Sequence, residues 1–332
     1  MDFDLNDEQK EIKQVAHDLL ASRSPFGKVR EAAEAGAYDP ALWSELVELG
    51  WPGIAVSAEH GGQELGAVEL SVLLEELGYA CAATPFLSSA TAAAVIEATG
   101  TPEQRSRWLP GLCSGEMTGG LGTRELAADA KDAAVIVLLD GEDAVLVDRS
   151  DADVQEFVTI DSTRRFATVA GDGEPLGAGV ADRIRSAIAV EVVGVCQRGL
   201  DMTLEYVKDR KQFGVPVGSF QAVSHRCAQM LLHTESARSA AYFAAWAADA
   251  DPDRLPEAAA LAAAAAADGG REVTAAAIQA HGGIGFTWEA DVHWLYKRSQ
   301  LDAALLGGSR RHRAALARFG AARVAERAAS TA

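Results

Sequence analysis

Two segments in the second half of the chain combine residue types that bind phosphate. The first, residues 209–214, holds a basic pair that begins at Arg210 and the aromatic Phe213, and Phe220 and Gln221 follow it. Helices are predicted on both sides of this segment, so its guanidinium and backbone N–H groups can meet an anion at a helix N-terminus. A solvated basic pair between two helices is the simpler alternative.

The second segment is a predicted helix end that runs into a glycine turn. Gln279 lies in the last helical turn, and Gly282 and Gly283 allow the backbone to approach a ligand closely. A glycine pair after a helix also serves as an ordinary C-terminal cap. A third, densely basic patch at Ser309–Arg313 stands out in an acidic chain. Each segment alone is weak evidence, and the three together indicate a site for an anionic ligand.

Helical periodicity dominates residues 1–116, which we expect to form an N-terminal helical domain. Asn6 and Gln9 predict a capping box at its first helix. Apolar residues then recur at helical spacing. Further helices are expected at Pro40–Leu49, Ala67–Tyr79, Ser88–Ala98 and Pro102–Leu112.

The pattern changes to short apolar runs over residues 117–179. The run Ala133–Leu139 is followed by an Asp-Gly turn and a second run, Ala144–Val147; together these predict a hairpin. Glu156–Ile160 and Arg165–Val169 are two further expected strands. We therefore predict a small, reduced antiparallel β domain.

Long helices return over residues 180–332. Four of them, joined by short connections, predict a C-terminal four-helix bundle. The first starts near Val180, and the others are expected at Phe220–Ala250, about Pro256–His281 and about Leu305–Arg327. The expected fold is mainly α, with a small β domain between two helical domains.

Composition argues against some classes of partner and predicts the cellular compartment of the protein. The net charge of −18 repels nucleic acid and anionic membranes, so neither is an expected partner. The acidic N-terminus and the lack of 18 strongly apolar residues in a row predict a cytoplasmic protein. Cysteines 81, 113, 196 and 227 lack metal-ligand spacing, which predicts reduced packing residues and no metal site.

The chain resembles the acyl-CoA dehydrogenase family over nearly its whole length. Glu48–Ile54, Glu59–Gly62 and Glu75–Gly78 are similar to the N-terminal domain of that family. Residues 210–221 and 279–285 resemble its two most recognisable motifs. The family joins an N-terminal helical domain, a β domain and a four-helix bundle, so the resemblance implies the architecture already expected from the pattern.

The resemblance also implies a cofactor and a reaction. In the family, FAD lies at a dimer interface, and the two motifs reach from one subunit to FAD held mainly by the other. A carboxylate removes an α-proton from an acyl-CoA while the β-hydrogen leaves as hydride to the flavin, and an electron-transfer flavoprotein is the acceptor. By resemblance, Arg210 binds the pyrophosphate and Gln279, Gly282 and Gly283 approach it, while Phe213, Phe220 and Gln221 line the dinucleotide.

The chain departs from the family at the catalytic base. Counting from Gln279 without gaps places the usual glutamate at Leu306. Some members place it before an arginine of the first bundle helix, and that position is Ile184 here. The β domain also lacks the family's flavin-holding stretches, since no tryptophan occurs between Trp108 and Trp246. The sequence stretches that hold the flavin ring in the family are therefore degenerate here, whereas the two motifs that reach FAD in a neighbouring subunit are retained.

Other carboxylates are weaker candidates for the base. Glu191 lies in the apolar run Ile188–Val193, where burial would raise its pKa toward a useful value. A buried structural partner of an arginine is the favoured interpretation of Glu191. Glu289 and Asp291 follow the glycine turn and fit charges at a helix N-terminus.

The leading hypothesis is an FAD-dependent acyl-CoA dehydrogenase subunit that is active only with a full-length, base-carrying subunit, as an α2β2 heterotetramer. Similar small subunits act in actinobacterial steroid degradation, so the analogy suggests a bulky, steroid-derived CoA thioester. One alternative is a self-sufficient homo-oligomeric enzyme with an unusual base. Another is a non-catalytic scaffold or acyl-CoA-binding protein.

Overall fold

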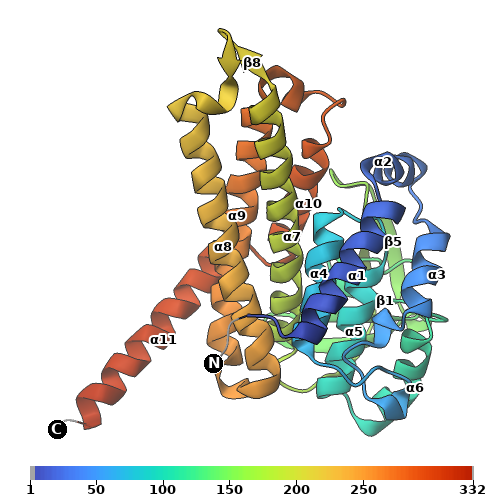
Figure 1. Ribbon diagram of the computed structural model, residues 1–332. Helices are drawn as coiled ribbons and strands as arrows, with labels where there is room; N and C mark the ends of the chain where they lie inside the picture. Colours follow the sequence, from blue (N-terminus) through green and yellow to red (C-terminus); the bar gives the residue numbers. More distant parts are fainter. Residues whose placement is uncertain (1–3, 331–332) are drawn as a thin grey trace.

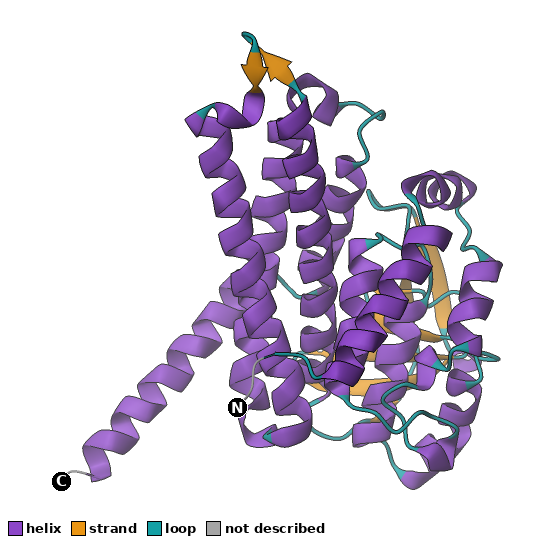
Figure 2. Ribbon diagram, viewed as in Figure 1, coloured by secondary structure: helices purple, strands orange, loops and turns teal. Residues whose placement is uncertain are grey.

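The computed structural model describes residues 4–330 and arranges them as two parts that lie side by side (Figure 1). A tall bundle of long helices forms one part. Shorter N-terminal helices packed around a β-sheet form the other. Helices account for most of the chain, as Figure 2 shows by colour, so the predicted mainly α fold with a β unit in the middle is confirmed.

The N-terminal part is helical up to Cys113. The predicted capping box is present: the Asn6 side chain accepts a hydrogen bond from the Gln9 backbone N–H at 2.8 Å, and the Gln9 side chain accepts one from the Asn6 N–H at 2.9 Å. The second helix was not predicted; unlike α1 and α3, it has no side-chain cap at its N-terminus. The helices are α1 (Asp7–Arg23), α2 (Phe26–Ala35), α3 (Pro40–Glu48), α4 (Ala67–Tyr79), α5 (Phe86–Thr99) and α6 (Pro102–Cys113).

The β unit is a seven-stranded mixed sheet, so the prediction of a purely antiparallel unit was wrong. Its strand order is β5-β6-β2-β1-β3-β4-β7. Strand β1 runs parallel to β3, with Leu121 opposite Val137. The glycine-rich sequence of β1 carries no strand pattern, which is why its pairing was missed. The strands are β1 (Gly119–Thr123), β2 (Ala127–Ala128), β3 (Val135–Asp140), β4 (Asp143–Asp148), β5 (Asp153–Phe157), β6 (Phe166–Ala170) and β7 (Glu174–Pro175).

The bundle contains four long packed helices, but its fourth member differs from the prediction. That member is α10 (Val292–Leu305), which packs against α7 and α9. The helix expected at 305–327 is α11 (Ser309–Ser330), which begins beside α9 and leaves the bundle (Figure 1). Sequence periodicity missed α10 because several of its buried residues are charged or polar. The other members are α7 (Val180–Asp209), α8 (Gln221–Ala250) and α9 (Leu255–His281).

The structure of the described residues bears on two expectations drawn from composition: the role of the cysteines and the lack of a membrane-spanning helix. All four cysteines are buried and free, and burial raises the pKa of the Cys81 and Cys196 thiols to about 12, as expected of packing residues. Between residues 4 and 330, none of the helices is long and apolar enough to cross a membrane.

Two glycines bring α4 and α7 into backbone contact and so join the two parts of the molecule. A Cβ added at Gly194 would lie 1.9 Å from the Glu75 carbonyl oxygen, and one added at Gly78 would lie 2.1 Å from that of Glu191. Neither distance is compatible with a side chain. The close approach of these helices therefore depends on glycine, which has no side chain, at both positions.

We predict that Gly194→Ala destabilises the protein by about 1–3 kcal/mol, because the added methyl group forces α4 and α7 apart. Thermal unfolding monitored by circular dichroism measures the change. Gly199→Ala on the same helix is the matched control: its nearest neighbouring atom would lie 3.8 Å away, and alanine favours helix by about 1 kcal/mol over glycine. Equal melting temperatures for the two variants would contradict the proposed contact.

Candidate functional site

The predicted anion-binding residues of the first segment lie at one exposed end of the bundle. Helix α7 ends at Asp209, and a short hairpin of β8 (Lys211–Gln212) and β9 (Val215–Pro216) follows it. The hairpin is at the tip of the bundle in Figure 1. Phe213 stands in the turn with a φ of +52° and is 94% exposed. A phenylalanine in a left-handed conformation and in solvent indicates a side chain positioned for something outside this chain.

Helix α8 begins directly after this hairpin. Phe220 caps α8, and its ring lies edge-on to Phe213 with a centroid separation of 6.2 Å. Gln221 is the first residue of α8 and is exposed. The side chain of Arg210 is exposed as well, and it makes no hydrogen bond or ion pair with any residue in the described part of the chain. The segment therefore presents a free guanidinium beside two aromatic rings.

The second predicted segment lies at the same end, because α7 and α9 finish together. The ring of Tyr206, in the last turn of α7, stacks on His281 at the end of α9 with centroids 4.4 Å apart. Gln279 is exposed, Gly282 has a φ of +65°, and a Cβ at either Gly282 or Gly283 would meet no atom within 4 Å. The backbone at the glycine pair is open to an approaching ligand.

Beside the predicted Phe213 and Phe220 lie four further exposed apolar residues that were not predicted. We define the tip surface as Phe213, Val215, Phe220, Ile284, Phe286 and Trp288, which are between 39% and 94% exposed. An apolar group of this size on one end of a molecule is typical of a contact surface. In the sequence, the aromatic residues Phe286 and Trp288 after the glycine turn were the signal for this surface, and they were overlooked beside the glycine motif.

The two positions at which the resemblance led us to expect a catalytic base are buried and apolar. Leu306 follows α10 with 2% of its surface exposed, and Ile184 of α7 has 1% exposed. The carbonyl oxygen of Leu306 accepts a hydrogen bond from Nε2 of the buried His312 at 2.7 Å. Burial lowers the pKa of His312, so this imidazole favours its neutral form. Neither position presents a group that takes up a proton from a substrate.

Glu191 belongs to a buried group of five ionisable side chains, which we call the buried ion cluster: Asp161, Arg164, Glu191, Arg298 and Asp302. Each of the five has 5% or less of its surface exposed. Arg164 Nη2 lies 2.6 Å from Glu191 Oε2, and Arg164 Nη1 lies 2.7 Å from Asp302 Oδ1. Arg298 bonds Asp161 at 2.9 Å and Glu191 at 3.1 Å.

The buried ion cluster joins three separated parts of the chain. Asp161 and Arg164 come from the loop between β5 and β6, Glu191 from α7, and Arg298 and Asp302 from α10. Arg298 also donates to the Ala82 carbonyl oxygen at 3.2 Å. The arrangement agrees with a structural interpretation of Glu191, whose carboxylate is occupied by two guanidinium groups. No sequence pattern indicated the two loop residues.

The basic patch at Ser309–Arg313 is only partly free. Arg311 bonds Glu142 at 3.1 Å, Arg313 bonds Asp268, and His312 is buried. A cavity of about 720 Å³ lies beside the patch, along the N-terminal half of α11. The structure thus separates this patch from the tip surface and uses most of its charge to fasten α11.

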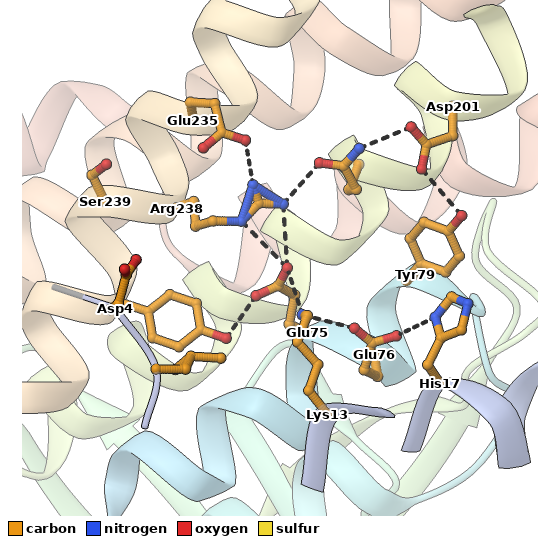
Figure 3. A pocket seen from close by; sticks show the side chains of 13 residues that line it. Asp4, Lys13, His17, Glu75, Glu76, Tyr79, Asp201, Glu235, Arg238 and Ser239 are labelled. Atoms are coloured by element: carbon orange, nitrogen blue, oxygen red, sulfur yellow. Dashed lines mark hydrogen bonds and ion pairs between the residues drawn. The ribbon is translucent and has the colours of Figure 1, made fainter. Parts of the chain in front are cut away.

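A larger cavity of about 910 Å³ lies where α1 and α4 meet α7 and α8 (Figure 3). None of the predicted site residues lines it. Glu75 is its centre: Lys13 lies 3.1 Å from Oε1, and Arg238 lies 3.2 Å from the same atom. The Tyr242 hydroxyl donates to Glu75 Oε2 at 2.7 Å.

Charge makes this cavity a poor site for a phosphate-bearing ligand. Its lining holds five carboxylates against two cations, Lys13 and Arg238, and one histidine. These charges bond to one another across the helices, as the dashed lines of Figure 3 show. The network ties the N-terminal helices to the bundle, and the tip surface remains the candidate functional site.

Burial gives the side chain of Asp302 an unusually high pKa. Burial, and then the negative charge of Glu191, raise the pKa of Asp302 to about 8, against the opposing pull of Arg164 and Arg298. Its second oxygen, Oδ2, has no hydrogen-bond partner among the described residues, which also disfavours the charged form. Folded Asp302 is therefore protonated over a range in which unfolded Asp302, with an ordinary pKa near 3.8, is ionised.

This difference predicts a pH-dependent stability. Its contribution is complete below about pH 4, falls as pH rises and is lost once pH passes about 8, because unfolding releases a proton in that window. Asp302→Asn removes the contribution, so its melting temperature should rise relative to the natural chain between pH 5 and 8 and stay level above. Thermal unfolding across this range, with exposed Asp153→Asn as control, tests the claim. Parallel curves for Asp302→Asn and the natural chain would contradict it.

Comparisons with known proteins agree with the fold. The family description "Acyl-CoA dehydrogenase, N-terminal domain" matches residues 6–116, and "Acyl-CoA dehydrogenase, C-terminal domain" matches residues 175–321. A protein of Mycolicibacterium smegmatis described as acyl-CoA dehydrogenase IpdE2 is 33% identical, with 92% of this chain and 96% of the relative covered. Its namesake in Mycobacterium tuberculosis is 32% identical over 92% and 94%.

Solved structures with the same fold include a complex of two named components. The structure described as "Tcur3481-Tcur3483 steroid ACAD G363A variant" has a TM-score of 0.88 and 26% identity, and covers 96% of this chain and 99% of its own. The ChsE4-ChsE5 complex from Mycobacterium tuberculosis has a TM-score of 0.85 at 23% identity, with 97% and 99% covered, which supports the fold.

Proposed function

The chain belongs to the acyl-CoA dehydrogenase family, and we propose that it is a half-site subunit of an FAD-dependent acyl-CoA dehydrogenase. In this role it contributes FAD-contacting residues to an unlike subunit that carries the base and holds the flavin ring. The observation that carries the proposal is a contrast within one bundle. The binding residues at the tip are exposed, whereas Leu306 and Ile184 are apolar and closed.

The groups at the tip fit the diphosphate end of FAD, the cofactor typical of the family. Arg210 supplies a guanidinium that pairs with no carboxylate of the described chain, and guanidinium groups bind phosphate oxygens in pairs. The open backbone at Gly282 and Gly283 allows close approach, and Gln279 adds a polar side chain. Phe213 and Phe220 offer flat apolar faces for rings. When bound, FAD supplies the acceptor for the hydride that leaves the acyl group.

The residues at the family's reactive positions fit a structural role. Leu306 cannot accept a proton, and the carboxylate of Glu191 is held by Arg164 and Arg298. A self-sufficient enzyme would need Glu191 to leave both guanidinium groups and reach a substrate. Breaking a buried ion pair costs about 3–5 kcal/mol, so the alternative of an unusual base in this chain loses its best candidate.

The relatives guide the choice of substrate and assembly. The solved structure at 26% identity is named for two components and for a steroid, which favours a bulky, steroid-derived CoA thioester and a pair of unlike subunits here. An α2β2 heterotetramer with an electron-transfer flavoprotein as acceptor remains the expected arrangement. A non-catalytic scaffold is the competing function, and it predicts no flavin in any assembly.

The proposal predicts that Arg210→Ala weakens FAD retention by the assembled complex about ten- to a hundredfold. A charge-assisted contact to phosphate contributes roughly 1.5–3 kcal/mol, and the substitution removes it. Flavin absorbance per protein after gel filtration measures the loss. Lys208→Ala, which removes an exposed cation from the last turn of α7, is the control and should retain FAD. Equal flavin content in Arg210→Ala and the natural complex would overturn the role of Arg210.

The proposal also predicts no dehydrogenation of any acyl-CoA by this chain alone with an artificial electron acceptor. Loss of a general base lowers a rate by about 10²–10⁴. Co-expression with a base-carrying subunit should restore turnover, and replacing the glutamate of that subunit by glutamine should abolish it. Turnover by the purified chain alone would support the self-sufficient enzyme instead.

A further inference from the structure

A stacked pair of rings links the two segments at the tip of the bundle. The rings of Tyr206 and His281 have centroids 4.4 Å apart and planes 21° from parallel. Tyr206 lies one helical turn before Arg210, whose backbone N–H donates to the Tyr206 carbonyl oxygen at 2.9 Å. His281 is the last residue of α9 and directly precedes Gly282. Each ring therefore belongs to the helix end that carries one of the two segments.

This stack is a specific contact between the two helix ends. Within the described part of the chain, no hydrogen bond or ion pair joins residues 204–221 to residues 278–288. Stacked aromatic rings stabilise a contact beyond the area that they bury. The glycine turn also folds back on the imidazole side, since a Cβ added at Gly285 would lie 3.0 Å from the Cβ of His281. A displaced His281 would therefore move the glycine turn, and loss of the Tyr206 ring would remove the link to α7.

The imidazole is held in one orientation. His281 Nδ1 lies 2.8 Å from the carbonyl oxygen of Ala277, one turn earlier in α9. A carbonyl oxygen only accepts a hydrogen bond, so Nδ1 carries the proton. Burial lowers the pKa of His281, so the ring favours its neutral form and offers Tyr206 a fixed, uncharged face. The pair supplies no positive charge of its own, so its contribution to an anion site is geometric.

We propose that Tyr206 and His281 are positioning residues for the cofactor site. Their stack sets the separation between the Arg210 guanidinium and the open backbone at Gly282, so that both reach the same diphosphate. The inference rests on the proposed function, because it takes the diphosphate of FAD as the ligand. It adds that α7 and α9 must end at a fixed separation, since two groups bind one ligand together only when both are held in the right geometry. Neither ring has to touch the cofactor.

Flavin release from the complex with the unlike subunit tests this inference. The rate at which FAD leaves after dilution is followed by flavin fluorescence, without turnover. Tyr206→Leu and His281→Leu each break the stack from one side. Tyr206→Phe is the conservative variant, because it keeps the ring and removes a hydroxyl that bonds to none of the described residues. Phe243→Leu is the control, because it disrupts another stacked pair of the bundle, with Trp246 at 6.1 Å.

Tyr206→Leu and His281→Leu should each release FAD about three- to tenfold faster than the natural complex. Tyr206→Phe and Phe243→Leu should match the natural complex. In an Arg210→Ala background, Tyr206→Leu should add no further effect, because residues that act through one another are not additive. Melting temperatures check that both leucine variants fold, and either one alone suffices for the test.

The double substitution separates failure of this inference from failure of the proposed function. Natural release in Tyr206→Leu, full additivity with Arg210→Ala, or fast release in Tyr206→Phe would overturn the positioning role and leave the proposed function standing. Natural release in Arg210→Ala itself would overturn the role of Arg210 in the proposed function, and the inference with it.

Discussion

The buried ion cluster is the interaction on which the rest of the structure depends. It places two arginines, the carboxylates of Asp161 and Glu191, and the protonated Asp302 in a dry interior, where each charge is tolerable only because the others compensate it. Arg164 reaches from the β5–β6 loop to Glu191 and Asp302, while Arg298 returns from α10 to Asp161. These ion pairs therefore fix the positions of the sheet, α7 and α10 relative to one another. Loss of either arginine, or of Asp161 or Glu191, leaves an uncompensated charge, so these side chains are held in place and are not free to take part in a reaction.

This constraint separates binding from chemistry within the chain. The interior serves packing: it holds the buried ion cluster and the apolar, buried Leu306 and Ile184, the two positions at which the resemblance led us to expect a base. At the tip of the bundle, Arg210 and the open glycines are accessible from outside, and in the proposed function they bind the anionic part of the cofactor. A protein with its binding groups outside and its reactive positions filled is physically suited to completing the site of a neighbour.

The sequence predicted what depends on local patterns and missed what depends on distant contacts. Asn6 and Gln9 form their capping box because both partners lie within one helical turn. The two predicted segments lie at the same end of the bundle, since α7 and α9 end side by side through the Tyr206–His281 stack, while their role in binding stays a prediction. Helix α10 was missed because Arg298 and Asp302 are polar where periodicity requires apolar residues, and their partners lie more than a hundred residues away. The parallel pairing of β1 and β3 was invisible for a similar reason: a strand of Gly-Gly-Leu-Gly-Thr gains its conformation from its neighbours.

The number of FAD molecules per assembly tests the central claim most directly. In a complex of unlike subunits, native mass spectrometry counts each chain and each cofactor together. A half-site subunit predicts one FAD for every pair of unlike chains, and no FAD bound to this chain when it is purified alone. One FAD for each chain, or a homo-oligomer of this chain that retains FAD, would contradict the account, because the chain would then hold a flavin of its own.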